Sequence, residues 1–92
     1  MILHLRHIDG SGKYFADRME FIVRRKFLSS KYVLEVIGHG FGFETYPCWV
    51  FNKKESAEKL KDYIVSKFNS EYPTIDIRNI QKEILKEDTL NN

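Results

Sequence analysis

Residues 31–51 hold the pattern that most constrains the fold of this chain. Two runs, residues 31–38 and 41–51, are rich in β-branched and aromatic residues, which favour strands. The tripeptide Gly38-His39-Gly40 separates them and is typical of a turn. The sequence therefore predicts a β-hairpin, and Pro47, which has no backbone donor, indicates an edge position or a bulge in its second strand.

A helix over residues 53–69 is predicted to follow the hairpin. Asn52 is a typical N-cap residue, and Glu55, three positions later, completes a capping pattern. The apolar residues of this segment recur at helical spacing, namely Ala57, Leu60, Ile64 and Phe68. Together these signals predict a helix that packs one face against the hairpin.

The two ends of the chain are predicted to add strands. Residues 2–8 are short and β-leaning, and the turn-forming run at residues 9–12 ends them. Residues 74–80 are predicted as a strand through Ile75 and Ile77. The spacing of Ile77, Ile80 and Ile84 suits a helix equally well.

Residues 13–29 fit two interpretations. A helix gathers six apolar residues on one arc, Phe15, Ala16, Met19, Ile22, Val23 and Phe27. A strand instead makes Met19, Phe21, Val23 and Phe27 alternate with Glu20, Arg24 and Lys26. The strand requires a hairpin through Ser29-Ser30, which supplies neither Gly nor Asn for a tight two-residue turn. The helix is therefore the preferred prediction.

These elements predict an α+β fold. With a helix at 13–29 the order is β-α-β-β-α-β, the ferredoxin-like arrangement with both helices on one face of the sheet. With a strand there, the fold is an antiparallel β-meander followed by two helices. We expect a small single domain over residues 1–87, with a frayed C-terminal tail at 88–92.

Composition narrows the class of protein. Apolar residues make up 42% of the 92 residues, too many for a disordered chain. The single cysteine, Cys48, forms no intrachain disulfide, and no stretch is long and apolar enough for a membrane span. The first residues lack a secretory leader pattern. We therefore expect a cytoplasmic protein that has no membrane partner.

No catalytic or metal-binding pattern emerges. The run Asp9-Gly10-Ser11-Gly12-Lys13 lacks the first glycine and the final Ser or Thr of a phosphate-binding loop. His4 and His7 point to opposite faces of a strand, so the sequence predicts no metal site. Cys48 is interpreted as a small core residue far from His39. We expect no enzymatic activity, no catalytic residue and no cofactor.

Residues 39–46 read His-Gly-Phe-Gly-Phe-Glu-Thr-Tyr and are similar to the RNP1 octapeptide of RNA-recognition motifs. The resemblance implies that Phe41 and Phe43 share a sheet face and stack on bases. His39 stands where that family has a cation, and Glu44 where it has a valine. RNA or single-stranded DNA binding through this sheet face is therefore the alternative function, with nucleic acid as partner.

Both faces of the predicted hairpin are apolar, which favours a binding surface. Charge is uneven as well: residues 1–54 carry nine Lys or Arg against five Asp or Glu. We expect a non-enzymatic module that binds a protein partner or a second copy as a homodimer. Its predicted site combines the aromatic hairpin with the adjacent basic run, and the binding residues are His39, Phe41, Phe43, Tyr46, Trp49, Arg24, Arg25 and Lys26.

Overall fold

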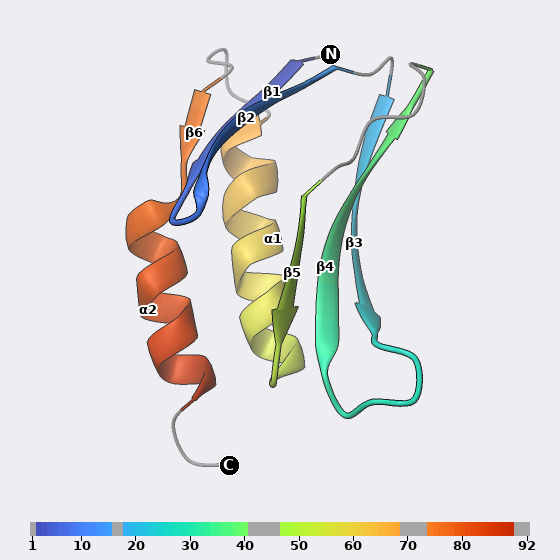
Figure 1. The fold of residues 1–92 in the computed structure, drawn as a ribbon, viewed down its shortest axis with the longest axis vertical. Helices are drawn as coiled ribbons and strands as arrows, with labels where there is room; N and C mark the ends of the chain where they lie inside the picture. The colour runs from blue at the N-terminus through green and yellow to red at the C-terminus, as the bar shows by residue number, and fades with distance from the viewer. Residues whose placement is uncertain (1, 16–17, 41–46, 69–73, 90–92) are drawn as a thin grey trace.

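The computed structural model describes residues 2–15, 18–40, 47–68 and 74–89, which form two three-stranded β-sheets and two helices (Figure 1). The fold is α+β, as expected. In chain order the elements are β1 (Ile2–His7), β2 (Gly10–Phe15), β3 (Arg18–Arg25), β4 (Tyr32–His39), β5 (Cys48–Phe51), α1 (Lys54–Phe68), β6 (Thr74–Asp76) and α2 (Arg78–Asp88).

The first sheet has the strand order β2-β1-β6. Strands β1 and β2 form an antiparallel hairpin in which His7 pairs with Gly10, so the connecting turn holds only Ile8 and Asp9. Gly10 has a φ of 140°, a backbone conformation that side-chain-bearing residues rarely adopt. Strand β6 lies parallel to β1, with Leu5 opposite Ile75.

The second sheet has the strand order β3-β4-β5 and is antiparallel throughout. Strand β3 occupies the segment for which a helix was the preferred prediction, so that prediction is wrong. The segment forms a strand because its side chains alternate between the two faces of the sheet. Met19, Phe21 and Val23 turn toward the core, and the residues between them turn outward. The ferredoxin-like order is therefore not found.

The alternative topology is closer to the structure but incomplete. Strands β3, β4 and β5 form a meander that α1 follows, as that alternative requires. Strands β1 and β2, however, belong to a separate sheet, and β6 lies between the two helices in the sequence. The β4–β5 register also differs from a tight hairpin, because Cys48 pairs with Glu35 rather than lying near Lys31.

Helix α1 confirms the prediction for residues 53–69. It contacts β3, β4 and β5 of one sheet and β6 of the other, so its apolar residues help to fill the space between the sheets (Figure 1). Ala57, Leu60 and Ile64 are fully buried on it. The predicted strand at 74–80 splits at Ile77: β6 ends at Asp76, and α2 begins at Arg78.

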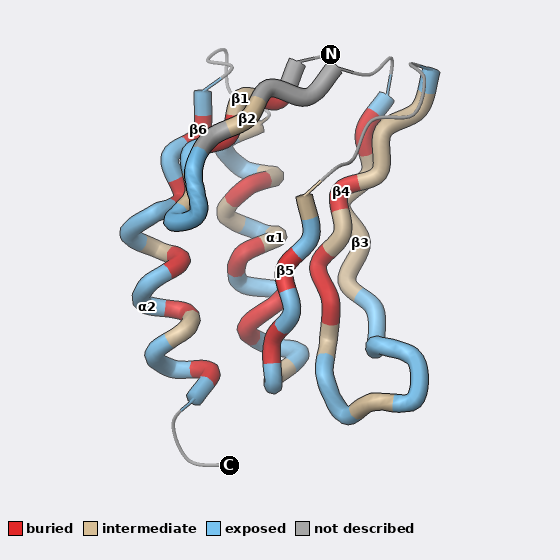
Figure 2. The backbone as a smooth tube through the Cα atoms, viewed as in Figure 1, coloured by how far each residue is buried: buried red, intermediate tan, exposed pale blue. Residues whose placement is uncertain are grey.

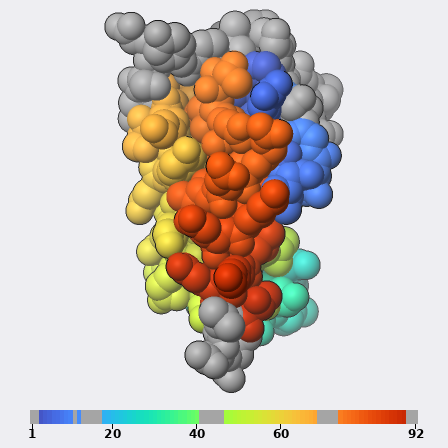
Figure 3. Space-filling view, turned by 90° about the vertical axis from the view of Figure 1, so that its left-hand side faces the viewer, coloured from blue at the N-terminus to red at the C-terminus, as the bar shows by residue number. Residues whose placement is uncertain are grey.

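The core lies between the inner faces of the sheets and the two helices, where the buried residues in Figure 2 gather. Helix α2 packs against α1 and β1, and its outer surface faces the viewer in Figure 3. Asp88, which was predicted to lie in the frayed tail, is the last residue of α2 and is buried. The buried core residues are Leu3, Leu5, Met19, Leu34, Val36, Trp49, Phe51, Ala57, Leu60, Ile64, Ile75, Ile77 and Ile84.

Candidate binding surface

The predicted aromatic site divides into a buried residue and residues outside the description. Trp49 lies in the core with only 9% of its surface exposed, and its ring meets the His7 ring edge to face at 6.4 Å between centroids. The strand β5 alternates buried and exposed residues, which turns Trp49 inward. Phe41, Phe43 and Tyr46 lie outside the described residues. Trp49 is therefore a core residue.

The outer face of the second sheet carries apolar and charged residues together. The strand registers place the following residues on it: Arg18, Glu20, Ile22, Arg24, Val33, Glu35, Ile37, His39, Cys48 and Val50. Cys48 is exposed, contrary to its interpretation as a core residue, and Val50 is 43% exposed. The face is therefore mixed rather than uniformly apolar.

Ion pairs neutralise much of the charge on this outer face. Arg24, one of the predicted binding residues, donates a hydrogen bond from Nε to Glu35 at 3.0 Å and forms an ion pair with the same carboxylate. The hydrogen bond from Arg24 to Glu35 raises the pKa of the guanidinium. Glu20 contacts both Arg18 and His39 at 3.1 Å. Arg24 and His39 are therefore engaged within the sheet.

The turn between β3 and β4 exposes two large apolar side chains. Phe27 is 83% exposed and Leu28 is 91% exposed. The turn that joins β3 to β4 lies at the lower end of this hairpin in Figure 1, and Figure 2 colours most of its backbone as exposed. Adjacent exposed apolar side chains at the end of a projecting hairpin are costly in water, and such groups mark interaction sites.

Hydrogen bonds hold this turn in one shape. Lys26 donates its backbone N–H to the carbonyl of Lys31 at 2.8 Å, and Ser29 donates to the carbonyl of Lys26 at 3.1 Å. The Ser29 hydroxyl accepts the N–H of Lys31 at 3.1 Å, while the guanidinium of Arg25 donates to the Ser29 carbonyl at 3.0 Å. Leu28 has a φ of 54°, a left-handed conformation that costs about 1–2 kcal/mol for a residue with a side chain. These contacts therefore hold the backbone from which the side chains of the turn project.

Cations flank the two apolar side chains. Arg25, Lys26 and Lys31 are exposed on either side of the turn. A shallow, open hollow of about 670 Å³ lies among the turn residues Arg25, Lys26, Phe27, Leu28, Ser29 and Ser30. We call residues 25–31 the basic-apolar turn. It includes two of the predicted binding residues, Arg25 and Lys26, but its apolar part was not predicted as exposed.

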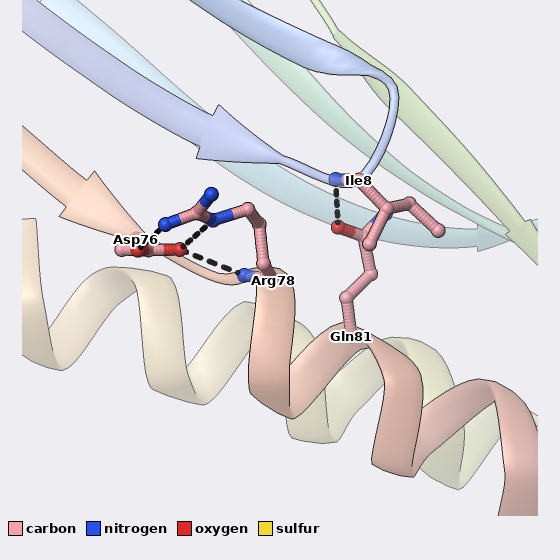
Figure 4. Close-up of polar contacts among 4 residues, drawn as sticks. All are labelled: Ile8, Asp76, Arg78 and Gln81. Carbon is pink, nitrogen blue, oxygen red and sulfur yellow. Dashed lines mark hydrogen bonds and ion pairs between the residues drawn. The ribbon is translucent and has the colours of Figure 1, made fainter.

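The start of α2 is the second polar cluster of note (Figure 4). Asp76 accepts hydrogen bonds from the guanidinium and from the backbone N–H of Arg78, and these bonds, chiefly those of the guanidinium, lower the pKa of Asp76 to about 2. Gln81 is buried, and its Oε1 accepts the backbone N–H of Ile8 at 3.1 Å. These groups satisfy one another, so the cluster fastens α2 to the β1–β2 turn.

The candidates for metal binding and nucleophilic catalysis stay apart. His4 contacts Thr74 at 2.9 Å between Nδ1 and Oγ1, whereas His7 turns inward against Trp49. Cys48 lies opposite Glu35 rather than beside His39. Within the part of the chain that the structure describes, no cluster of three or more His, Cys, Asp or Glu side chains could hold a metal ion.

Phe27 and Leu28 are the surface residues that the sequence interpretation missed. The prediction placed Phe27 on the packed face of residues 13–29, and it considered only a two-residue turn at Ser29-Ser30. The actual connection has four residues between Lys26 and Lys31, a common length in hairpins that needs no Asn-Gly pair. The sequence signal for this turn was the pair Lys26 and Lys31, which flank the four uncharged residues 27–30.

Comparisons with protein-family models, with curated proteins and with solved structures find no match to this chain. Neither of the helices among the described residues is long and apolar enough to cross a membrane. Function is therefore inferred from the chemistry of the basic-apolar turn.

Proposed function

We propose that this protein is a non-enzymatic binding module that docks onto a partner protein through the basic-apolar turn. The observation that carries the proposal is the near-complete exposure of Phe27 and Leu28 in a turn held by hydrogen bonds. A preorganised turn loses little conformational entropy on binding, so more of the burial energy contributes to affinity. The exposed pair supplies the apolar anchors that interface centres use.

The flanking charges define the complementary partner. Arg25, Lys26 and Lys31 surround the anchors, so the matching surface is an apolar pocket with carboxylates at its rim. A peptide segment with leucine-like side chains between aspartates or glutamates has this chemistry. Binding to such a segment buries the anchors and pairs the cations at the rim.

The same surroundings favour a protein over a nucleic acid. Glu35 neutralises Arg24, and Glu20 is partly exposed on the same sheet face, so a phosphate backbone on that face meets carboxylates. Of the two exposed apolar side chains of the turn only Phe27 has a ring, whereas single-stranded nucleic acids are bound on several rings that stack successive bases. These features support a protein partner as the first candidate.

The test begins with a library of displayed peptides selected against the whole protein. We expect the enriched peptides to combine apolar and acidic residues, and to bind the purified protein in a fluorescence titration. Phe27→Ser and Leu28→Ser should each weaken this binding by about tenfold or more, as the loss of a central anchor implies. Ile8→Ser is the matched control, because Ile8 is also an exposed apolar residue in a hairpin turn.

Two results would contradict the proposal. One is enriched peptides that bind the Phe27→Ser variant as tightly as the unchanged protein. The other is tight binding of single-stranded DNA or RNA that depends on Phe27 and weakens steeply with salt, which is the signature of phosphate contacts. The second result would assign the turn to nucleic acid instead.

A further inference from the structure

Strand β3 leaves one of its edges unpaired among the described residues. It is the outermost strand of the order β3-β4-β5, and it is eight residues long, from Arg18 to Arg25. The inward-facing Phe21 and Val23 remain only partly buried at this edge. An edge of this length can receive another strand.

The hydrogen bonds of the hairpin indicate which backbone groups of β3 face this edge. Lys26 donates to Lys31, which makes this pair a hydrogen-bonded pair of the ladder. Pairs alternate along an antiparallel ladder, so Arg24, Ile22 and Glu20 also bond to β4. The residues between them therefore direct their N–H and C=O groups toward the open edge, namely Met19, Phe21, Val23 and Arg25.

We propose that β3 pairs antiparallel with β3 of a second copy of this chain, with Ile22 opposite Ile22 at a twofold axis. In this register Glu20 of each copy lies opposite Arg24 of the other, on the same outer face. Phe21 lies opposite Val23, and both direct their backbone groups to the shared edge. The pairing is self-complementary, as a twofold interface requires.

One neighbouring register fits less well. Shifting the pairing by two residues in one direction places Arg18 opposite Arg24 and leaves Glu20 opposite Ile22. In the proposed register the like charges are Arg18 and Lys26, which meet at the exposed ends, where solvent screens them. Arg18 also keeps its contact with Glu20 of its own copy. The β3-β4-β5 sheet of one copy would then join the same sheet of the other copy into one six-stranded sheet, following the usual geometry of edge pairing.

This dimer is independent of the proposed docking function. The paired strands end at the Arg18–Lys26 pairs, so the exposed anchors of the basic-apolar turn, Phe27 and Leu28, extend past the end of the other strand. The two turns would lie at opposite ends of the joined sheet, each exposed to a partner. Loss of the dimer therefore leaves the turn intact, and loss of the turn leaves the dimer intact.

The test is sedimentation velocity of the whole protein over a wide range of concentration, with two complementary charge variants. Glu20→Arg places arginine opposite arginine, and Arg24→Glu places glutamate opposite glutamate, so each variant alone should dimerise about tenfold more weakly. In a mixed dimer the introduced arginine of one chain faces the introduced glutamate of the other, and the two unchanged partners also face each other. Because opposite charges then meet at both places, we expect the dimer to return in the mixture.

A second pair of variants tests the dimer independently, in case the charge variants do not fold. Ile22→Lys brings two lysines together at the axis and should yield a monomer. Ile37→Lys, on the same outer face but on the inner strand β4, should leave the dimer unchanged. The proposal is overturned if the unchanged protein is monomeric throughout, if Ile22→Lys still dimerises, or if folded charge variants fail to dimerise when mixed.

Discussion

The buried carboxylate of Asp88 makes the sharpest prediction about stability. Its two oxygens accept the backbone N–H groups of Asn52 and Lys53 at 2.8 and 2.9 Å, just before α1 begins. Asp88 therefore caps α1 from the far end of α2, a task that the sequence assigned to the Asn52 side chain. Replacing a capping residue by alanine costs about 0.5–2 kcal/mol, and hydrogen bonds to a charged group are worth about 1.5–3 kcal/mol each.

Asn52 is exposed, so its backbone N–H can bond to water when the carboxylate is removed. The loss should therefore stay well below the sum of two hydrogen bonds to a charged group and close to the upper value for a capping residue. We expect Asp88→Ala to lower the free energy of unfolding by about 2 kcal/mol. For a domain of this size that corresponds to a fall in Tm of about 8–16 °C. Asp88→Asn keeps one acceptor oxygen and should cost about half as much. Urea unfolding followed by circular dichroism measures both values.

The same carboxylate should make stability depend on pH. Burial acts to raise the pKa of Asp88, but hydrogen bonds from Asn52, Ser56 and Lys53 outweigh it and hold the pKa below the ordinary value of 3.8. A lowered folded-state pKa stabilises the fold above the unfolded value, and this stabilisation is lost as pH falls through the folded value. The stability gap between the unchanged protein and Asp88→Asn should therefore be constant near neutral pH and shrink below about pH 4.

Asp62→Asn is the matched control, because Asp62 is an exposed carboxylate in the middle of α1. Its free energy of unfolding should change by less than about 0.5 kcal/mol. The capping role of Asp88 is refuted if Asp88→Ala is equally harmless. It is also refuted if the stability gap for Asp88→Asn is unaffected by acid.

Four further substitutions test the packing, each by denaturant unfolding. Trp49→Ala should cost about 3–5 kcal/mol and Val50→Ala less than about 1 kcal/mol, and similar costs would contradict the inward placement of Trp49. Leu28→Gly should raise stability by up to about 1 kcal/mol, since glycine accepts the left-handed backbone; a clear loss would contradict the strain at this residue. Gln81→Ala should cost about 1–3 kcal/mol by leaving the turn amide of β1–β2 without its acceptor, and no loss would refute that role.

The parts of the fold that local signals determine could be predicted from the sequence. Helix α1 has its apolar spacing within fifteen residues, and the structure places it within one residue of the predicted limits. Strand β4 likewise matches its β-branched run. Strand β5 lies within the predicted second strand of the hairpin, residues 41–51, and pairs antiparallel with β4 as a hairpin requires.

The parts that depend on distant contacts could not be predicted. Residues 18–25 fit helical and strand periodicity alike, and pairing with β4 across the turn decides between them. The separation of β1 and β2 into their own sheet depends on β6, which is more than fifty residues away in the sequence. The division of α2 from β6 at Ile77 depends on the same contact.

The candidate surface was predicted only in part for a related reason. The basic run was visible, but Arg24 is engaged by Glu35, a partner eleven residues away that only the strand register identifies. Whether Phe27 is buried or exposed depends on where the chain reverses. Once the turn lies at residues 27–30, its side chain has no core to enter.

The central claim is that the basic-apolar turn binds a partner protein, and a mapping of the binding surface by nuclear magnetic resonance tests it most directly. Isotope-labelled protein is titrated with an enriched acidic, leucine-containing peptide while the backbone amide shifts are followed. We predict that the largest shift changes fall at residues 25–31 and disappear in Phe27→Ser. Changes confined to α2 or to the outer face of β5, with residues 25–31 unaffected, would contradict the account.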